Sequence, residues 1–277
     1  MVYKTILYTV NDRIATITLN RPDRLNAWTL RMSKEVRHAM FKAAEDEMVR
    51  VIIITGAGHA FCAGADMDEL KVAVKKGLSA LDDTERKSQI KVNGNEKIKN
   101  DFLKRYSYFP AIPKPVIAAI NGPAVGIGLV HILFCDIRIA SENARFSTTF
   151  ARRGLIAEHG IAWILPKIVG FANAIELLFT GRMVDAEEAL HIGLVHKVVP
   201  QDKLNEATID LAIDLSTKVS PRSLKVIKRQ LYYAQLQTLE EAIDMADKEM
   251  GLSLESEDFK EGIAHFLEKR APIFTGK

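Results

Sequence analysis

The sequence has few cysteines and little net charge, and these two features exclude several classes of protein. Among its 277 residues the only cysteines are Cys62 and Cys135, which form neither a Cys-x-x-Cys pair nor a zinc-ligand spacing. A disulfide-stapled secreted domain is therefore excluded, and a cytoplasmic protein is expected. Lys and Arg number 38 against 35 Asp and Glu, a formal charge of only +3. That charge is too weak to indicate nucleic acid or an acidic membrane as a partner.

We also expect neither export nor insertion into a membrane. The apolar stretch before Asn11, Asp12 and Arg13 is too short for the core of a signal peptide. One uncharged run, from Pro115 to Cys135, is long enough to cross a bilayer. Its middle reads Asn-Gly-Pro-Ala-Val-Gly-Ile-Gly, which would break a helix and leave backbone groups unpaired in lipid. We therefore expect no membrane segment and interpret the run as a buried strand, a tight turn and a buried helix.

Hydrophobic periodicity predicts an α/β fold that becomes almost entirely helical toward its C-terminus. Alternation or β-branched runs indicate strands at residues 3–10, 13–19, 51–55, 116–120, 136–140 and 145–147. Helical spacing indicates helices at residues 29–47, 67–76, 161–169, 172–179, 186–192, 204–218, 221–235, 239–250 and 259–269. The pattern of strands followed by helices is typical of a sheet that is covered by helices on its faces.

Two strand-to-helix junctions share one design. The first extends from Gly56 to Asp66 and the second from Gly122 to Gly128, and each brings a Gly-rich turn to the start of a helix. Backbone N–H groups at such a turn are unpaired within the helix, and the helix dipole adds positive character, so they favour an oxyanion or a phosphate. Neither junction has the P-loop spacing or the third glycine of a dinucleotide-binding turn, so phosphate binding is disfavoured. Glycines can also serve close packing alone, but two junctions of one kind favour a function.

Six motifs occur in order along the chain: Asn20-Arg21-Pro22 with Leu25-Asn26-Ala27, Phe61 to Asp66, Ala119 to Ala124, Cys135 to Ala140, Thr180-Gly181-Arg182 and Gly193-Leu194-Val195. Together they resemble the crotonase superfamily of enoyl-CoA hydratases and isomerases. The resemblance implies an α/β fold of the crotonase (ClpP-like) type, a spiral of ββα units over residues 1–200 that carries an acyl-CoA site. It also implies a helical trimerisation region over residues 201–277 and a homotrimer or dimer of trimers. The implied partner is an acyl-CoA thioester, and no separate cofactor is expected because coenzyme A is part of the substrate.

The resemblance places the catalytic donors on the backbone. In this family two N–H groups hold the thioester carbonyl, and the motif positions assign them to Ala65 and Ile127. Enolate chemistry needs such donors because charge moves onto the thioester oxygen when the α-proton leaves. The two glutamates that hold water in the family's hydratases fall at Val130 and Phe150, and neither side chain can transfer a proton. Ordinary hydration is therefore disfavoured.

Glu158 falls where the resembling Δ3,Δ2-enoyl-CoA isomerases keep a single catalytic glutamate. One carboxylate can take an α-proton and return it at the γ-carbon, so isomerisation is the favoured reaction. Apolar neighbours such as Leu155, Ile156 and Trp163 could raise the pKa of this carboxyl. From the residues alone, Glu158 could instead cap the helix that begins near Gly160. An atypical hydratase, an acyl-CoA hydrolase and a noncatalytic CoA-binding protein of the same fold stay open as alternatives.

The resemblance also assigns residues to substrate binding. They are Arg24 and Leu25 near the nucleotide, Ala63, Gly64 and Asp66 in the first junction, Val130, His131 and Phe150 at or beside the two glutamate positions, and Phe266 with Lys269 on a C-terminal helix that can reach a neighbouring subunit's ligand. Solvated charges and ordinary packing would also explain these residues. For Asp66 in particular, capping of the following helix is the simpler explanation.

Two histidines and one polar segment complete the expected site. His131 adjoins Val130 and His159 adjoins Glu158, so either could assist proton transfer, although a lone histidine on an apolar helix is more often a core residue. No two histidines have His-x-x-x-His spacing, so no metal is expected. Residues 77–100 are charged and polar, and we expect them to form a helix and loop that shape the acyl pocket.

Overall fold

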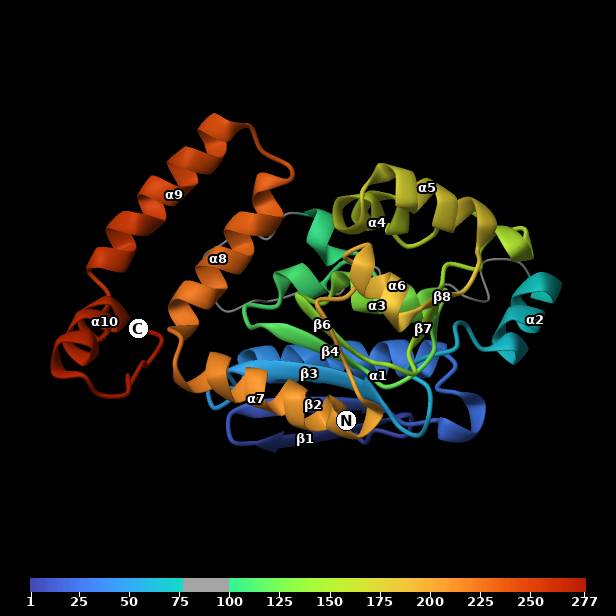
Figure 1. The fold of residues 1–277 in the computed structure, drawn as a ribbon, viewed down its shortest axis with the longest axis horizontal. Coiled ribbons are helices and arrows are strands. Elements are labelled where there is room, and N and C mark those ends of the chain that lie inside the picture. Colours follow the sequence, from blue (N-terminus) through green and yellow to red (C-terminus); the bar gives the residue numbers. More distant parts are fainter. Residues whose placement is uncertain (77–99) are drawn as a thin grey trace.

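A six-stranded, mostly parallel sheet forms the centre of the fold (Figure 1). The computed structural model describes residues 1–76 and 100–277. The first two strands pair antiparallel, and each later strand joins in parallel to give the order β1-β2-β3-β4-β6-β9. The strands are β1 (Ile6–Asn11), β2 (Ile14–Leu19), β3 (Val51–Gly56), β4 (Val116–Ile120), β6 (Ile137–Ser141) and β9 (Lys197–Val199).

Helices cover both faces of this sheet, and the alternation of side chains along β3 shows how. Ile52 and Ile54 belong to the larger core, which they share with α1 (Leu30–Glu45) and α3 (Ile127–Phe134). Val51 and Ile53 point to the other face and pack with residues of α7 (Leu204–Thr217). A strand that is buried on both faces must be apolar throughout, which explains the continuous β-branched run. The sheet is thus the middle layer of three.

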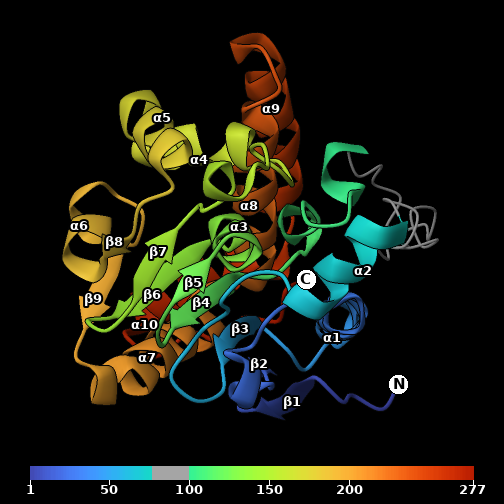
Figure 2. The ribbon, with the colours of Figure 1, turned by 90° about the vertical axis from the view of Figure 1, so that its right-hand side faces the viewer.

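A second, three-stranded sheet lies beside the second junction. Its order is β5-β7-β8, with β5 parallel to β7 and β7 antiparallel to β8. β5 contacts α3, and both lie near β4 in Figure 2. Its strands are β5 (Ala124–Val125), β7 (Arg145–Ser147) and β8 (Val184–Asp185). The sequence predicts β7 but not β5, β8 or β9, because strands of two or three residues show little periodicity.

The C-terminal helices extend to one end of the molecule, opposite to α2 (Met67–Lys76) (Figure 1). Lys228 joins them to the sheet through an ion pair of 2.7 Å with Asp136, and Tyr232 donates a hydrogen bond of 3.2 Å to the same carboxylate. Apolar side chains such as Leu239 remain exposed on these helices. The remaining helices are α4 (Ile161–Val169), α5 (Phe171–Thr180), α6 (Ala186–His191), α8 (Pro221–Ala234), α9 (Leu239–Leu254) and α10 (Glu257–Glu268). Short 3-10 turns are η1 (Pro22–Arg24), η4 (Asn100–Leu103), η5 (Phe109–Ala111), η6 (Ala151–Arg153) and η7 (Gln201–Lys203).

The strands and helices expected from the sequence are confirmed, with small differences at their ends. The uncharged run 115–135 is indeed a strand, a turn and a buried helix, β4 and α3. Within residues 1–76 and 100–277 no helix is both long and apolar enough to span a membrane. Residues 77–99, expected to shape the acyl pocket, lie outside the described residues. The division at residue 200 stays a prediction, and α7, on its C-terminal side, packs on the sheet.

Candidate active site

The first junction presents the backbone N–H of Ala65. Trp28 and Ala65 form an isolated parallel bridge. Both hydrogen bonds of the bridge belong to Trp28, whose N–H donates to the Gly64 carbonyl (2.7 Å) and whose carbonyl accepts from the Asp66 N–H (2.9 Å). In a parallel pairing the residue between those two bonds directs its own N–H to the opposite side. Among the described residues, the Ala65 N–H has no acceptor.

The second junction presents the N–H of Ile127, the first residue of α3. The preceding Gly126 has φ 53° and ψ −116°, a conformation that residues with a side chain rarely adopt, and it makes no side-chain cap bond. Its own N–H donates to the Ser147 carbonyl at 2.9 Å, which fixes the turn against β7. The Ile127 N–H is one of the helix-initial donors with no intrahelical partner, and the described residues offer it no acceptor. The dipole of α3 adds positive character at this end.

A second isolated bridge holds the two junctions side by side. Cys62 pairs with Ala124, donating its N–H to the Pro123 carbonyl (3.0 Å) and accepting from the Val125 N–H (2.9 Å). Gly128 permits this approach, because a Cβ there would lie 2.4 Å from the Cys62 carbonyl oxygen. The two unpaired donors therefore come from turns that are hydrogen-bonded to each other. Such a pair of N–H groups can stabilise negative charge on a carbonyl oxygen.

Glu158 lies in the turn before α4, partly exposed, and burial raises the pKa of its carboxyl above the ordinary value. The N-cap of α4 is Gly160, with no side-chain cap bond, so the structure does not bear out capping by Glu158. His159 and Gly160 both have left-handed backbone, φ 59° and 83°, which turns the chain sharply beside the carboxylate. His159 Nε2 lies 3.5 Å from Glu158 Oε2. Burial, together with the charge of Arg105, lowers the pKa of His159 to about 4, so the imidazole is neutral at neutral pH.

A chain of aromatic contacts connects this carboxylate with both junctions. The ring of Tyr106 lies 4.5 Å from the ring of His159 and 5.3 Å from that of His131, measured between centroids. His131 stands one turn after Ile127 on α3, and its ring lies 3.8 Å from the ring of Trp28, the bridge partner of Ala65. Sequence reasoning missed Trp28 and Tyr106. The available signal for both was their position, directly after the first motif and within the aromatic-rich stretch 102–109.

His131 is a buried, neutral residue. Its Nδ1 lies 2.6 Å from the Ile127 carbonyl oxygen, which can only accept, so Nδ1 carries the proton. Burial lowers the pKa of His131 to about 3, which makes it a weak base at neutral pH. The core role that the sequence allowed for this histidine agrees with these contacts. Its Nε2 has no hydrogen-bond partner within the described part of the chain.

The two hydratase glutamate positions are occupied by apolar core side chains. Val130 is fully buried on α3, and Phe150 is 5% exposed at the edge of the same core. The Phe150 ring lies about 4.0 Å from the point that a Cβ on Gly126 would occupy, so it stands next to the second donor. No carboxylate is therefore available at either position. Among the described residues no three His, Cys, Asp or Glu side chains gather in a way that could hold a metal ion.

The residues assigned to coenzyme A lie along the first junction and on α10. Asp66 accepts from the Asp68 N–H (2.9 Å), which caps α2 as the sequence suggested, and pairs with Arg21 at 2.8 Å. The Arg21 guanidinium holds the pKa of Asp66 below its usual value, although burial alone would raise it. Arg24 Nη1 lies 3.6 Å from Asp68 Oδ2, and the Leu25 carbonyl accepts from the Ala63 N–H at 3.0 Å. Phe266 is 77% exposed on α10, and Lys269 is the C-cap of that helix.

Sheet topology and paired junctions together define a crotonase-fold protein, and solved structures of that class superimpose on it throughout. A 30% identical enoyl-CoA hydratase from Bacillus anthracis matches with a TM-score of 0.86 over 99% of this chain and 100% of that one. A family model described as enoyl-CoA hydratase/isomerase matches residues 9–277, and the chain belongs to this family of enzymes.

Two curated relatives are isomerases. The 1,2-epoxyphenylacetyl-CoA isomerase of Escherichia coli K12 is 34% identical, over 98% of both chains. The trans-2-decenoyl-[acyl-carrier-protein] isomerase of Streptococcus mutans is 32% identical, over 100% of both chains. The family acts on acyl-CoA thioesters, and its members include both hydratases and isomerases.

Proposed function

We propose that this enzyme isomerises an enoyl-CoA, moving the double bond from the β,γ to the α,β position with Glu158 as its single acid and base. The observation that carries the proposal is the set of groups around the paired junctions. The N–H groups of Ala65 and Ile127 have no acceptor among the described residues, and ring contacts through Tyr106 connect their junctions with His159 beside Glu158. The two hydratase positions hold only Val130 and Phe150. Water addition needs an acid and a base around one water, whereas a 1,3-proton shift needs one group.

In the proposed first step, the Glu158 carboxylate removes a proton from the α-carbon of a 3-enoyl-CoA. The C–H electron pair moves into the α-carbon to carbonyl-carbon bond, and negative charge gathers on the thioester oxygen. The N–H groups of Ala65 and Ile127 donate to that oxygen and hold the dienolate. Each such donor is typically worth about 3 to 4 kcal/mol in the transition state.

In the second step the protonated Glu158 donates its proton to the γ-carbon. The electrons return from the oxygen, the carbonyl re-forms, and the new double bond lies between the α- and β-carbons. The raised pKa of Glu158 supports both steps, because a base whose pKa approaches the working pH accepts and returns a proton readily. His159 beside it is neutral at neutral pH, so this imidazole does not lower that pKa as a charged ion-pair partner would. Coenzyme A enters as part of the substrate, and the mechanism uses no other cofactor and no metal.

We further propose that Arg24, Leu25, Ala63, Gly64 and Asp66 line the path of the CoA moiety, with His131 beside the acyl group. Phe266 and Lys269 would act on the ligand of a neighbouring subunit, because α10 and α2 lie at opposite ends of one chain (Figure 1). A homotrimer or a dimer of trimers would provide such a neighbour. A groove of about 300 Å³ between α8 and α9, lined by apolar residues such as Leu231 and Met245, supports assembly through this region. Both cysteines are buried and free, which fits the cytoplasm as its location.

The experiment is a comparison of Glu158→Gln with Glu187→Gln, a matched change at an exposed position of α6. With a 3-enoyl-CoA, followed by the absorbance of the conjugated thioester, kcat should fall about 10²- to 10⁴-fold in the first variant and stay unchanged in the second. Full activity of Glu158→Gln would remove the proposed base. Hydration of a 2-enoyl-CoA by the wild type would favour the hydratase alternative, and binding of acyl-CoA without turnover would favour a noncatalytic protein.

A further inference from the structure

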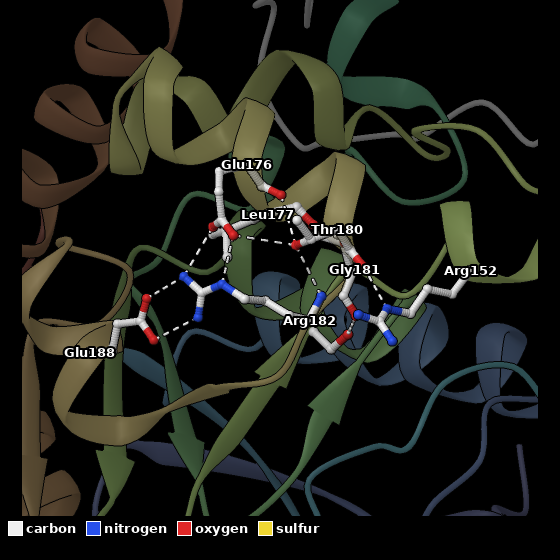
Figure 3. A network of polar contacts seen from close by, with 9 residues as sticks. Arg152, Glu176, Leu177, Thr180, Gly181, Arg182 and Glu188 are labelled. Carbon is white, nitrogen blue, oxygen red and sulfur yellow. Dashed lines mark hydrogen bonds and ion pairs between the residues drawn. The ribbon is translucent and has the colours of Figure 1, made fainter.

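The Thr180-Gly181-Arg182 motif has no place in the proposed chemistry, yet it carries a network of polar contacts beside the small sheet (Figure 3). The Arg182 guanidinium donates to both oxygens of Glu176 on α5, at 2.7 and 3.0 Å. On its other side it donates to both oxygens of Glu188 on α6, at 2.8 and 2.5 Å. Paired two-point contacts of this kind fix geometry as well as adding energy. Arg182 therefore clamps the end of α5 to α6.

The clamped segment is bonded directly to the strand behind the second donor. The Ser147 hydroxyl donates to the Gly181 carbonyl (2.9 Å), and the Thr148 hydroxyl donates to the Leu177 carbonyl (2.7 Å), both in buried positions. On the remaining side, Arg152 Nε donates to the Thr180 carbonyl (2.5 Å), as Figure 3 shows. β7 is thus tied at its end to the loop that Arg182 holds.

Gly181 brings the same segment into contact with the chain next to β7. Its φ is 54°, and a Cβ there would lie 3.2 Å from Thr149 Cα and 3.3 Å from Arg152 Cγ. Thr149 in turn lies on Gly126, with its Cγ2 3.5 Å from the point where a Gly126 Cβ would stand. The Gly126 N–H donates to the Ser147 carbonyl at 2.9 Å. Both sets of contacts, through Thr149 and through Ser147, connect Gly181 with Gly126, whose backbone conformation sets the direction of the Ile127 N–H.

We propose that Arg182 is a positioning residue for the Ile127 donor. The ion pairs of Arg182 fix the segment that contains Leu177 and Gly181. The carbonyls of these two residues bond the hydroxyls at the end of β7, and the Ser147 carbonyl of β7 accepts from the Gly126 N–H. Loss of the guanidinium leaves Glu176 and Glu188 facing each other, and their repulsion would loosen β7. The proposal rests on the proposed function, because it assigns Arg182 to one of the two donors of that site.

The test measures how strongly the site polarises a thioester carbonyl. The probe is butyryl-CoA with ¹³C at the carbonyl carbon, whose infrared stretching frequency falls when backbone donors bind the oxygen. Arg182→Gln should lose at least half of the wild-type frequency shift and about tenfold in kcat on a 3-enoyl-CoA, with a much smaller change in KM. Arg182→Lys, which keeps the charge but not the two-point geometry, should fall between the two.

Arg270 provides the matched control, because it also bonds two glutamates, Glu261 and Glu268, and its side chain is 35% exposed against 36% for Arg182. Arg270→Gln should lower Tm by a similar amount and keep the wild-type carbonyl frequency. If Arg182→Gln lowers Tm but keeps the wild-type carbonyl frequency, the positioning role is wrong. Ile127→Pro separates the two claims. If the carbonyl frequency shift is abolished by Ile127→Pro but kept in Arg182→Gln, only this inference is overturned. If the frequency shift is kept in Ile127→Pro, the proposed function is overturned and the inference with it.

Discussion

The two junctions deliver the same group, one unpaired backbone N–H, by different means. Ala65 is aimed by strand pairing, because both bonds of its bridge belong to Trp28. Ile127 is aimed by a helix start, and it depends on the left-handed backbone of Gly126 and on β7 behind it. A donor in a bridge is held by its immediate neighbour, whereas a donor at a helix start relies on support from elsewhere in the fold. The second junction should therefore be the more sensitive to distant changes.

The largest combined effect on stability and activity is expected where the two junctions touch. Gly128→Ala places a Cβ 2.4 Å from the Cys62 carbonyl oxygen, so α3 must move away from the first junction. We expect a loss of about 3 kcal/mol in the free energy of unfolding, typical of overpacking against backbone. We also expect at least a roughly 100-fold fall in kcat, as when one oxyanion donor is lost. Denaturant unfolding and steady-state kinetics measure the two effects.

Gly251→Ala is the control for that prediction. Gly251 lies in α9, where a Cβ would meet nothing within 4 Å, so the same substitution should leave kcat unchanged and stabilise the protein slightly. Equal kinetics in the two variants would show that the close contact between the junctions does not matter to the reaction.

Removal of the second donor alone is expected to have the next largest effect. Proline is tolerated at the first position of a helix, so Ile127→Pro removes the N–H while α3 can still form. We expect kcat to fall about 10²- to 10³-fold. Ile127→Ala loses only the side chain, so its kcat should stay within about threefold of the wild type, since the backbone N–H that stabilises the oxyanion is retained. Equal losses in the two variants would assign the effect to packing rather than to the donor.

The pH dependence of kcat/KM tests whether the Glu158 carboxylate is the base of the reaction. Glu158 must be ionised to take the α-proton, so kcat/KM should fall as the pH drops through its pKa. Burial raises that pKa, and the midpoint should therefore lie above the ordinary value for a glutamate. His159, with its pKa near 4, stays neutral through the upper part of this range. A midpoint at or below the ordinary glutamate value would indicate that the reacting carboxylate is solvent-exposed and is not the partly buried Glu158.

The smallest effect is expected from the first junction's side chains. Asp66→Ala removes the cap of α2 and the partner of Arg21, which should cost about 1 to 2 kcal/mol of stability. The Asp66 N–H that bonds Trp28 remains, so the Ala65 donor should keep its direction and kcat should change less than about threefold, far below the loss of a donor. A kcat loss as large as that of Ile127→Pro would contradict the view that the bridge alone aims Ala65.

The sequence predicted much of this arrangement, for identifiable reasons. β3 and the run that forms β4 and α3 are apolar, with glycines at the end of β3 and in the middle of the run, so the sequence pattern located them and placed both junctions. Glu158 and the two donors came from ordered motifs. Trp28 and Tyr106 could not be assigned, because their roles arise from ring contacts between segments far apart in the chain. The support of Gly126 by β7 was equally out of reach, since β5 and β8 have two residues each.

A crystal structure of the enzyme with a bound saturated acyl-CoA would show directly whether both N–H groups hold the thioester oxygen. The quantities to measure are the distances from the thioester oxygen to the backbone nitrogens of Ala65 and Ile127. We expect both distances to be about 2.7 to 3.1 Å, with a Glu158 carboxylate oxygen within reach of the α-carbon. A thioester oxygen that contacts only one of these nitrogens, or neither, would contradict this expectation.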